Sequence, residues 1–441
     1  MRRSLLRVWL PMAAGLAVGT GDLWAGPYSA GLNDPGNPFD APVPGFVGRD
    51  GDGKVPIDDG NGGTINARNK VNPLFFGWAV GWTAYVRADG QEPYNDPDLA
   101  LGPVTGDNFD VVSLGDLNST QIGTGAPPGS LILKFTDALH TAAIRNLPGA
   151  DFVVFENGLV AAVGTGGAGV GGVFADLAYV EVSSDGVNFA RFPSTSLTAT
   201  AVGPYGTINP TNVRNLAGKH ANSAGDSWGT PFDLSDLATD PLVIAGTVDL
   251  NNVRFVRVVD IPGDGSRHDS AGHSIYDAWQ TTGSGGMDLE AIGAISVPLT
   301  FEDWQTWKGL NVDQRGPLAD PDGDGVVNAV EYALGLDPLV PDADLLPKAR
   351  LTGGKLNIHF CRDTRAAQAV VEVLGASDLH GPWQTIARST SGGDLAAVPP
   401  YAPGIQDSSA SSIASVGVVR QHDVSAISNQ HFLKIVVSLT P

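Results

Sequence analysis

The residues whose types and spacing could do chemistry are concentrated between positions 320 and 331. Aspartates stand at Asp320, Asp322 and Asp324, Gly325 follows, and Glu331 closes the segment. This spacing fits the loop pattern D-x-[DN]-x-[DN]-G-x5-E. Ca²⁺ is a hard cation that binds about six to eight oxygen atoms, and the glycine allows the sharp turn that wraps the chain around it. The segment therefore predicts a calcium-binding loop.

Oxygen ligands at the other loop positions complete the predicted coordination shell. Val326 would offer its backbone carbonyl, Asn328 would bind directly or through water, and Glu331 would bind with both carboxylate oxygens. The alternative is an ordinary acidic, glycine-rich turn, but few such turns also place a β-branched residue at the eighth position and glutamate at the twelfth. The predicted metal ligands are Asp320, Asp322, Asp324, Val326, Asn328 and Glu331.

Short helices are predicted on both sides of the loop. Thr300 is a good N-cap for a helix that begins at Phe301 and places Trp304 and Trp307 on one face. A second helix is predicted over Asn328–Leu334, and a glycine follows it. Helix–loop–helix is the context in which this calcium pattern occurs.

The composition describes a globular, acidic chain. It has 441 residues, of which 42% are hydrophobic, so the length suggests about three domains and the apolar content allows real cores. The formal net charge of −21 argues against nucleic acid and anionic membranes as partners, because both attract basic surfaces. Cys361 is the single cysteine, so no intrachain disulfide can form, and its alternating surroundings predict a buried strand position rather than a nucleophile.

The first 25 residues are predicted to be an export signal peptide. Arg2, Arg3 and Arg7 precede a mostly apolar stretch over Val8–Val18, and the chain around Ala25 offers a cleavage point. The stretch is too short for a membrane-spanning helix, and no later segment reaches the necessary apolar length. We therefore expect a secreted or cell-surface protein without membrane insertion.

Turn residues separate many short strand-like segments, which predicts a mainly β protein. Residues 26–297 are predicted to form a β-sandwich with long loops, residues 298–347 the calcium-binding helix–loop–helix and a linker, and residues 348–441 a small C-terminal all-β domain. The predicted strands are Leu74–Val86, Asp110–Leu114, Ser130–Phe135, Asp151–Phe155, Ala178–Ser183, Arg254–Asp260, Leu289–Val297, Lys355–Phe360, Ala369–Val373, Val416–Arg420 and Phe432–Leu439.

Several sequence segments of the first domain resemble known secreted modules. Ala178–Phe189 carries a strand that ends in a Ser-Ser-Asp-Gly hairpin, Val253–Val258 is rich in valine and arginine, and Gly286–Gly293 follows as a closing strand. These three resemble the galactose-binding-like jelly roll. A wider set is similar to a group of uncharacterised secreted bacterial cell-surface proteins: Ala150–Gly158, Ala217–His220 and Gly229–Leu234. The resemblance implies a jelly-roll sandwich. It suggests sugar binding only as a general property of such modules, and it does not indicate an enzymatic activity.

The loop and the C-terminal domain carry two further resemblances. Residues 300–345 are similar to the calcium loops of thrombospondin type 3-like and dockerin-like modules, with Val327, Asn328 and Leu334–Pro338 as the matching positions. A dockerin has two such repeats and this chain has one, so recruitment through a dockerin interface is not expected. Residues 348–441 resemble a C-terminal β module of secreted bacterial proteins through Val371–Trp383.

Two short motifs match known site patterns without the context that those patterns need. Gly164–Gly169 spells G-x-G-x-x-G, but a poor helix start follows it, whereas dinucleotide binding requires a helix. Gly225–Gly229 spells G-x-S-x-G around Ser227, but neither a strand before it nor a helix after it is predicted. We interpret both segments as loops.

Other residues of the first domain offer weaker alternatives. Asp151, Glu156, Asp288 and Glu290 could supply paired glycosidase carboxylates, but solvent-facing strand positions are the ordinary expectation. Three tryptophans are candidates either for stacking on sugar rings or for the core: Trp78, Trp82 and Trp279.

A second calcium ion in the first domain is a further hypothesis. It would lie near Asp260, Asp264 and Asp269. His268 and His273 flank the last of these, but two imidazoles in a loop have no fixed geometry and do not support a zinc site.

The sequence therefore predicts an exported, non-catalytic, calcium-binding protein of the cell surface or the extracellular space, with glycan binding as its functional extension. Its partner would be an extracellular glycan or an envelope component. The alternatives are a polysaccharide-active hydrolase and a purely structural envelope component.

Overall fold

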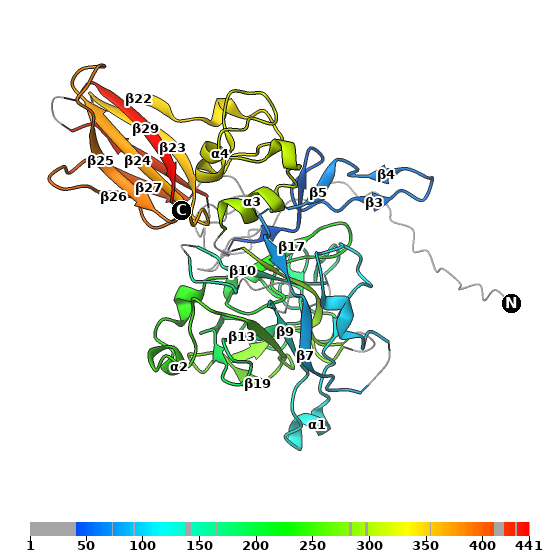
Figure 1. Ribbon diagram of the computed structural model, residues 1–441. Helices are drawn as coiled ribbons and strands as arrows, with labels where there is room; N and C mark the ends of the chain where they lie inside the picture. The colour runs from blue at the N-terminus through cyan, green and yellow to red at the C-terminus, as the bar shows by residue number, and fades with distance from the viewer. Residues whose placement is uncertain are drawn as a thin grey trace.

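The chain folds mainly into β-strands. The computed structural model describes residues 41–72, 74–90, 93–136, 143–147, 149–164, 166–281, 285–295, 299–352, 354–409, 419–427 and 430–440. Strands make up 35% and helices 11%, and several antiparallel sheets are present (Figure 1). The predicted mainly β fold class is confirmed.

Two sheets form the N-terminal β region, which we define as residues 43–295. The six-stranded sheet has the order β1-β17-β10-β21-β6, with β8 beside β21, and the five-stranded sheet has the order β14-β13-β18-β9-β7. The first sheet consists of β1 (Val43–Pro44), β17 (Trp228–Phe232), β10 (Phe152–Glu156), β21 (Asp288–Ala294), β6 (Gly77–Trp78) and β8 (Val112–Ser113). The second consists of β14 (Ala190–Arg191), β13 (Ala178–Ser183), β18 (Phe255–Asp260), β9 (Ser130–Lys134) and β7 (Gly81–Val86).

Short ladders and helical turns fill the long connections of this region. The ladders are β2 (Phe46–Gly48) with β5 (Asn69–Val71), β3 (Ile57–Asp58) with β4 (Thr64–Ile65), β11 (Leu159–Val160) with β12 (Val173–Phe174), β15 (Thr195–Ser196) with β16 (Val213–Arg214), and β19 (Asp264–His268) with β20 (Ser274–Tyr276). The helical turns are η1 (Pro97–Ala100), α1 (Ser119–Gly123), η2 (Pro210–Asn212), η3 (Leu234–Leu237) and α2 (Pro241–Ile244).

One hydrophobic core receives side chains from both sheets of the N-terminal β region. In β18, Val256 and Val258 are buried while Arg257 between them is partly exposed, as the two-residue period of a strand requires. From the other sheet, Phe152 and Val154 of β10 enter the same core. Apolar burial therefore holds the two sheets together.

The C-terminal region, which we define as residues 299–440, combines two short helices with two four-stranded sheets. The sheet orders are β22-β23-β28-β27 and β26-β25-β24-β29. The helical elements are α3 (Phe301–Trp307), η4 (Val312–Gln314), α4 (Asn328–Leu334) and η5 (Ala343–Leu345). The strands are β22 (Lys348–Thr352), β23 (Lys355–Asp363), β24 (Ala369–Ala376), β25 (Gln384–Thr390), β26 (Ala396–Ala397), β27 (Ile405–Ser409), β28 (Val419–Ser425) and β29 (Phe432–Leu439).

Local sequence explains where α3 and α4 begin and end. The Thr300 hydroxyl accepts a hydrogen bond from the Asp303 backbone N–H at 3.1 Å, which caps α3. Helix α4 ends at Gly335, which has a left-handed φ of 74° and donates its N–H to the Glu331 carbonyl at 2.8 Å. Both predicted helices are confirmed.

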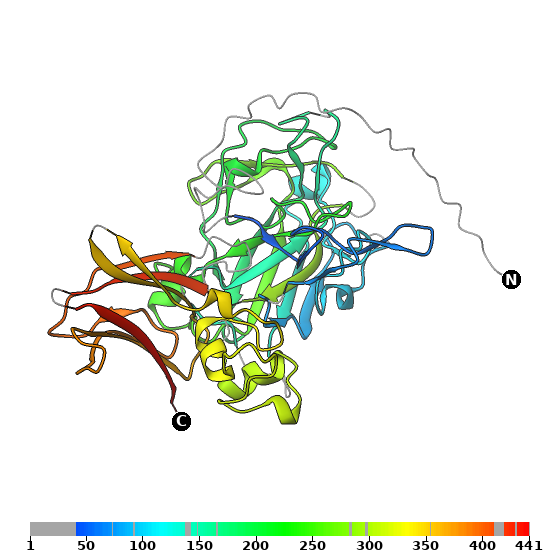
Figure 2. The same ribbon diagram turned by 90° about the horizontal axis from the view of Figure 1, so that it is seen from above.

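The helices and the C-terminal sheets share a second hydrophobic core. Trp304 of α3 and Tyr332 of α4 are almost fully buried and pack with their ring centroids 5.6 Å apart. The same core contains Phe360 of β23 and Val371 of β24. Figures 1 and 2 place the yellow helical segment against these sheets. The helix–loop–helix therefore folds as part of the C-terminal region.

A buried ion pair lies where the C-terminal region meets the N-terminal β region. The Arg365 guanidinium donates to the Asp363 carboxylate at 2.8 Å and also to the Leu74 backbone carbonyl at 2.9 Å. Both side chains of the ion pair are about 5% exposed. Nearby, Leu299 forms a bridge with Ala366. The hydrogen bond from Arg365 to Leu74 therefore connects the two regions, and the ion pair with Asp363 holds the guanidinium in place.

Most predicted strands are present, with small shifts at their ends. The predicted strand Leu74–Val86 is wrong as one element, because the backbone leaves the ladder after β6 and resumes pairing only at β7. Cys361 lies in β23, as predicted, but its side chain is only partly buried. The predicted signal peptide, Pro298 and most of Val416–Arg420 lie outside the described residues. Within the described part of the chain, no helix has the length and apolar character to cross a membrane.

Candidate metal centre

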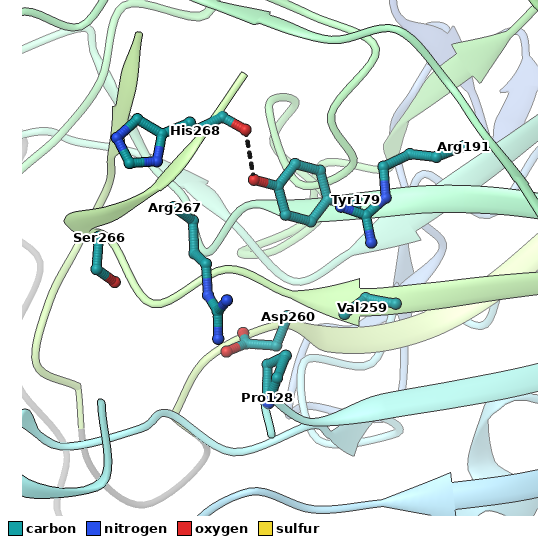
Figure 3. A pocket seen from close by; sticks show the side chains of 8 residues that line it. All are labelled: Pro128, Tyr179, Arg191, Val259, Asp260, Ser266, Arg267 and His268. Atoms are coloured by element: carbon teal, nitrogen blue, oxygen red, sulfur yellow. Dashed lines mark hydrogen bonds between the residues drawn. The ribbon is translucent and has the colours of Figure 1, made fainter. Parts of the chain in front are cut away.

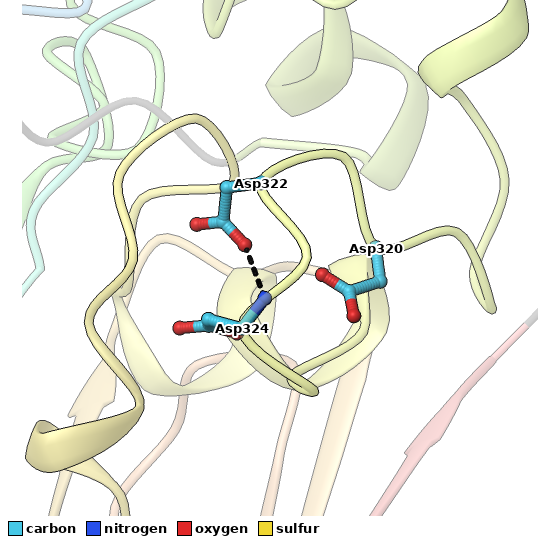
Figure 4. A group of neighbouring side chains, drawn as sticks. All are labelled: Asp320, Asp322 and Asp324. Atoms are coloured by element: carbon cyan, nitrogen blue, oxygen red, sulfur yellow. Dashed lines mark hydrogen bonds between the residues drawn. The ribbon is translucent and has the colours of Figure 1, made fainter.

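The calcium-type loop lies between α3 and α4 and gathers its three aspartates around one point. One carboxylate oxygen from each of Asp320, Asp322 and Asp324 lies within 4.8 Å of the others (Figure 4). Among the described residues, this is the one group of three or more aspartate, glutamate, histidine or cysteine side chains that meets this distance. The first half of the predicted ligand set is therefore assembled.

Backbone N–H groups of the loop hold these carboxylates in place. Asp320 accepts from Gly323 N at 2.9 Å and from Gly325 N at 3.0 Å. Asp324 accepts from Val326 N at 2.8 Å. Gly325 has a φ of 92°, a conformation that favours glycine, which explains the glycine at this loop position.

Glu331 is the most informative residue of the site. It lies in the first turn of α4 and is fully buried, yet neither of its carboxylate oxygens has a hydrogen-bond partner. Burial raises the pKa of Glu331 to about 8, and the charges of Asp322 and Asp342 add to the effect. A buried carboxylate that faces other carboxylates is costly unless a cation neutralises it.

Asn328 and Val326 occupy the other predicted ligand positions. The Asn328 side-chain amide donates to the Gln314 carbonyl at 2.9 Å and the Gly316 carbonyl at 3.0 Å, so it fastens the chain that precedes the loop. Its side-chain oxygen is buried without a partner and is available as an acceptor or ligand. Val326 is buried in the C-terminal core, which fixes the backbone at the seventh loop position.

Asp342 belongs to the site although the loop pattern does not include it. Its backbone N–H and that of Ala343 each donate to the Asp324 carboxylate at 2.8 Å, so the linker folds back onto the loop. The Asp342 side chain accepts from Asp337 N at 2.9 Å with one oxygen, and its other oxygen is buried without a partner. No periodicity or motif singles out this residue, because it approaches the loop only through the linker.

No family model matches this chain, and no curated protein or solved structure matches it.

The expectation that Asp151, Glu156, Asp288 and Glu290 face solvent is wrong, because all four are buried. They lie on or next to β10 and β21, which are central strands whose two faces are covered by different hydrophobic clusters. Two of them serve as buried acceptors. Glu290 accepts from the backbone of Thr105 and Gly106 at 2.7 Å, and Asp151 accepts from Leu234 N at 2.7 Å.

The segments Gly164–Gly169 and Gly225–Gly229 lack the elements that a dinucleotide-binding site and a catalytic serine turn require. Strand β12, not a helix, follows Gly164–Gly169. Ser227 is fully buried and β17 follows it directly, so its hydroxyl is not presented at a strand-to-helix turn. Of the three candidate tryptophans, Trp82 is 39% exposed, while Trp279 donates its indole N–H to the Leu117 carbonyl at 2.9 Å.

The structure does not support a second calcium site formed by Asp260, Asp264 and Asp269. Asp260, Asp264 and Asp269 do not form a group within 4.8 Å. Asp264 instead accepts from Ser266 N at 2.9 Å within its own turn, and Asp269 accepts from Ser196 N at 2.9 Å.

A pocket of about 250 Å³ opens beside β13, β18 and β19 (Figure 3). The Tyr179 hydroxyl donates to the His268 carbonyl at 2.7 Å, and the Arg191 guanidinium lies 4.2 Å from the Tyr179 ring centroid. The pocket wall is mostly polar, and its lining residues are Pro128, Tyr179, Arg191, Val259, Asp260, Ser266, Arg267 and His268.

Proposed function

We propose that the loop at residues 320–331 binds Ca²⁺ and that the ion stabilises the C-terminal region of an exported, non-catalytic surface protein. The observation that carries the proposal is Glu331, a fully buried carboxylate without a hydrogen-bond partner, close to the charges of the loop aspartates. Leaving such a charge unpaired costs several kcal/mol, and a bound Ca²⁺ removes that cost.

The proposed ligands come from the loop and from the helix that follows it. Each fills one of the fixed positions of the loop pattern, and Asp342 is a further candidate because its unpartnered oxygen and its charge both lie near Glu331. The proposed set is Asp320, Asp322, Asp324, the carbonyl of Val326, Asn328 and Glu331.

Ion binding would reach the C-terminal sheets through α4. Glu331 lies on this helix next to Tyr332, whose hydroxyl donates to the Leu299 carbonyl and accepts from Gln368 N at 3.0 Å. Leu334 on the same helix is buried in the core shared with β23 and β24. An ion that fixes the start of α4 therefore also fixes the packing of the C-terminal region and of the chain at the junction.

The finer fold that we propose for residues 26–297 is a jelly-roll β-sandwich. The support is the pair of antiparallel sheets that share one core, together with the resemblance of Ala178–Phe189 and Gly286–Gly293 to such modules. Export is supported by the sequence of the first 25 residues.

Replacing Glu331 by glutamine is expected to weaken calcium binding at least about 10-fold, since even changes next to a metal ligand cost roughly 10- to 100-fold in affinity. Glutamine keeps the volume of the side chain and removes its charge. Isothermal titration of the metal-free protein with Ca²⁺ measures the effect. Glu302→Gln, which changes an exposed residue of α3, is the matched control and should bind like the wild type. Equal affinities for all three proteins would contradict the ligand assignment.

Glycan binding is the second candidate function, and the pocket of Figure 3 favours it. Its volume of about 250 Å³ is below that of drug-sized sites, which are roughly 300–1,000 Å³, so it would accept a single sugar ring. Arg191, Arg267 and Ser266 offer hydrogen-bond donors for hydroxyl or carboxylate groups.

A glycan that uses this pocket should lose its affinity when Arg267 is replaced by alanine. We expect the wild type to be retained on immobilised polysaccharides, with uronate-containing ones included, and Arg267→Ala to elute at least about tenfold more readily, because one charged hydrogen bond contributes roughly 1.5–3 kcal/mol. Arg145→Ala, outside the pocket, is the control. Release of reducing ends would instead favour the hydrolase alternative, and no retention on any polysaccharide would favour the structural envelope component.

A further inference from the structure

Buried carboxylates gather at one end of the N-terminal β region, away from the loop at residues 320–331. They lie where β18 and β10 end and where β13 and β21 begin, and each is at most 5% exposed. Burying several like charges together is unfavourable unless each is protonated or paired with a cation. The group consists of Asp116, Glu156, Asp176, Asp260, Asp277 and Asp288.

Within this group, Asp116 and Asp260 each have one carboxylate oxygen that is buried without a hydrogen-bond partner. Their other oxygens are held by the backbone, that of Asp116 by Thr281 N at 3.0 Å and that of Asp260 by Met287 N at 2.9 Å. Neither carboxylate forms an ion pair within 4.0 Å among the described residues. Two fixed carboxylates therefore each keep an unsatisfied oxygen out of contact with water.

The two carboxylates are neighbours. The Thr281 hydroxyl donates to the Asp116 carboxylate at 3.2 Å and accepts from Gly286 N at 3.1 Å, and the next residue, Met287, donates its N–H to the Asp260 carboxylate at 2.9 Å. Burial raises the pKa of Asp260 well above its usual range, and the charge of Asp116 adds more than that of any other carboxylate. Asp277 is the next neighbour, since burial raises its pKa and Asp260 contributes the largest of the nearby charges.

The basic side chains close to this end do not neutralise the pair. Arg267 lines the same pocket as Asp260, and Figure 3 shows its guanidinium pointing toward that carboxylate, but the two form no ion pair within 4.0 Å. The buried Lys219 follows Gly218, which lies against Glu156 at the other side of the group. Neither Arg267 nor Lys219 therefore forms an ion pair with Asp116 or Asp260.

We propose that Asp116 and Asp260 hold a second hard divalent cation of the Ca²⁺ type at this end of the N-terminal β region. Asp277 is a neighbouring charge and not a third ligand, because the three carboxylates do not form a group within 4.8 Å. Carboxylate oxygens are the ligands that such ions prefer, and the remaining positions would be filled by backbone carbonyls or water. This site shares Asp260 with the site that the sequence suggested near Asp260, Asp264 and Asp269, but it does not include Asp264 and Asp269, whose carboxylates accept hydrogen bonds from Ser266 N and His273 N.

Counting bound ions in a protein whose loop site has been disabled tests this proposal independently of the first site. After dialysis against millimolar Ca²⁺ and removal of free ion, the Asp320→Ala/Glu331→Ala protein should retain one Ca²⁺ per chain by elemental mass spectrometry. Adding Asp116→Asn and Asp260→Asn should reduce this to none. The matched control adds Asp107→Asn and Asp185→Asn instead, two exposed turn carboxylates of the same region, and should keep the ion.

Two results would overturn the proposal. One is a loop-disabled protein that retains no ion, which would mean that the buried carboxyl groups are neutral acids. The other is retention of the ion after the Asp116 and Asp260 substitutions, with folding verified by circular dichroism. If that variant does not fold, the ion count of the loop-disabled parent still decides, and Asp260→Asn alone provides the milder test. Arg267→Gln should leave the ion in place, because a guanidinium carries a positive charge and cannot be a ligand of a cation.

Discussion

Removing Ca²⁺ is expected to lower the thermal unfolding midpoint of the C-terminal region by roughly 5–10 °C. A ligand that binds only the folded state at about 100 times its dissociation constant stabilises it by about 2.7 kcal/mol. For a unit of about 150–250 residues, each kcal/mol shifts the midpoint by roughly 2–4 °C. Calorimetry of the protein in millimolar Ca²⁺ and in chelator measures the difference.

The variant Asp320→Ala/Glu331→Ala should not respond to the ion. It also removes the buried, unpaired carboxylate of Glu331. Its midpoint in chelator should therefore equal or exceed that of the metal-free wild type, a result that simple loss of packing would not give. The control Glu302→Ala/Asp313→Ala, which removes two exposed acidic residues outside the loop, should respond like the wild type. If neither wild type nor control responds, residues 320–331 form only an acidic turn.

Replacing Arg365 by methionine is expected to destabilise the junction by about 3–5 kcal/mol. The substitution leaves Asp363 charged and buried, and breaking one partner of a buried pair has a cost of this size. It also removes the hydrogen bond from Arg365 to the Leu74 carbonyl, which connects the two regions. Denaturant unfolding measures the loss, and limited proteolysis near the junction should become faster.

The exposed pair of Arg388 and Glu372 provides the comparison. The Arg388 side chain is 51% exposed, so Arg388→Met should cost no more than about 1 kcal/mol. The double variant Arg365→Met/Asp363→Leu should recover most of the lost stability, because it leaves no unpaired charge. Equal effects of Arg365→Met and Arg388→Met would show that the buried pair does not support the junction.

The loop and its helices could be predicted from the sequence because their determinants are local. A hydroxyl at Thr300, glycines at Gly325 and Gly335, and carboxylates at alternate positions act within a few residues of one another. Their spacing alone therefore specifies the caps, the turn and the gathering of Asp320, Asp322 and Asp324. The strands were predictable for the same reason, because buried and partly exposed side chains alternate every second residue along β18, and this period can be seen in the sequence.

The parts that escaped prediction depend on contacts between distant segments. Asp342 joins the loop only because the linker folds back onto Asp324. Glu156 and Asp288 are buried because β10 and β21 lie in the middle of a sheet with a hydrophobic cluster on each face. Strand order is not encoded in local periodicity, so the sequence could not distinguish a solvent-facing carboxylate from a buried one.

By itself, then, the sequence determined the mainly β fold class, the helix–loop–helix and the gathering of three aspartates around one turn. Only the tertiary structure decided that this turn shares a core with the C-terminal sheets, that Glu331 is buried without a hydrogen-bond partner, and that the carboxylates of Asp116 and Asp260 are held by Thr281 and Met287 near Gly286. The physical reason is that turns and caps are formed by neighbours in the chain. Burial, and with it the cost of an uncompensated charge, is set by strands that are distant in sequence.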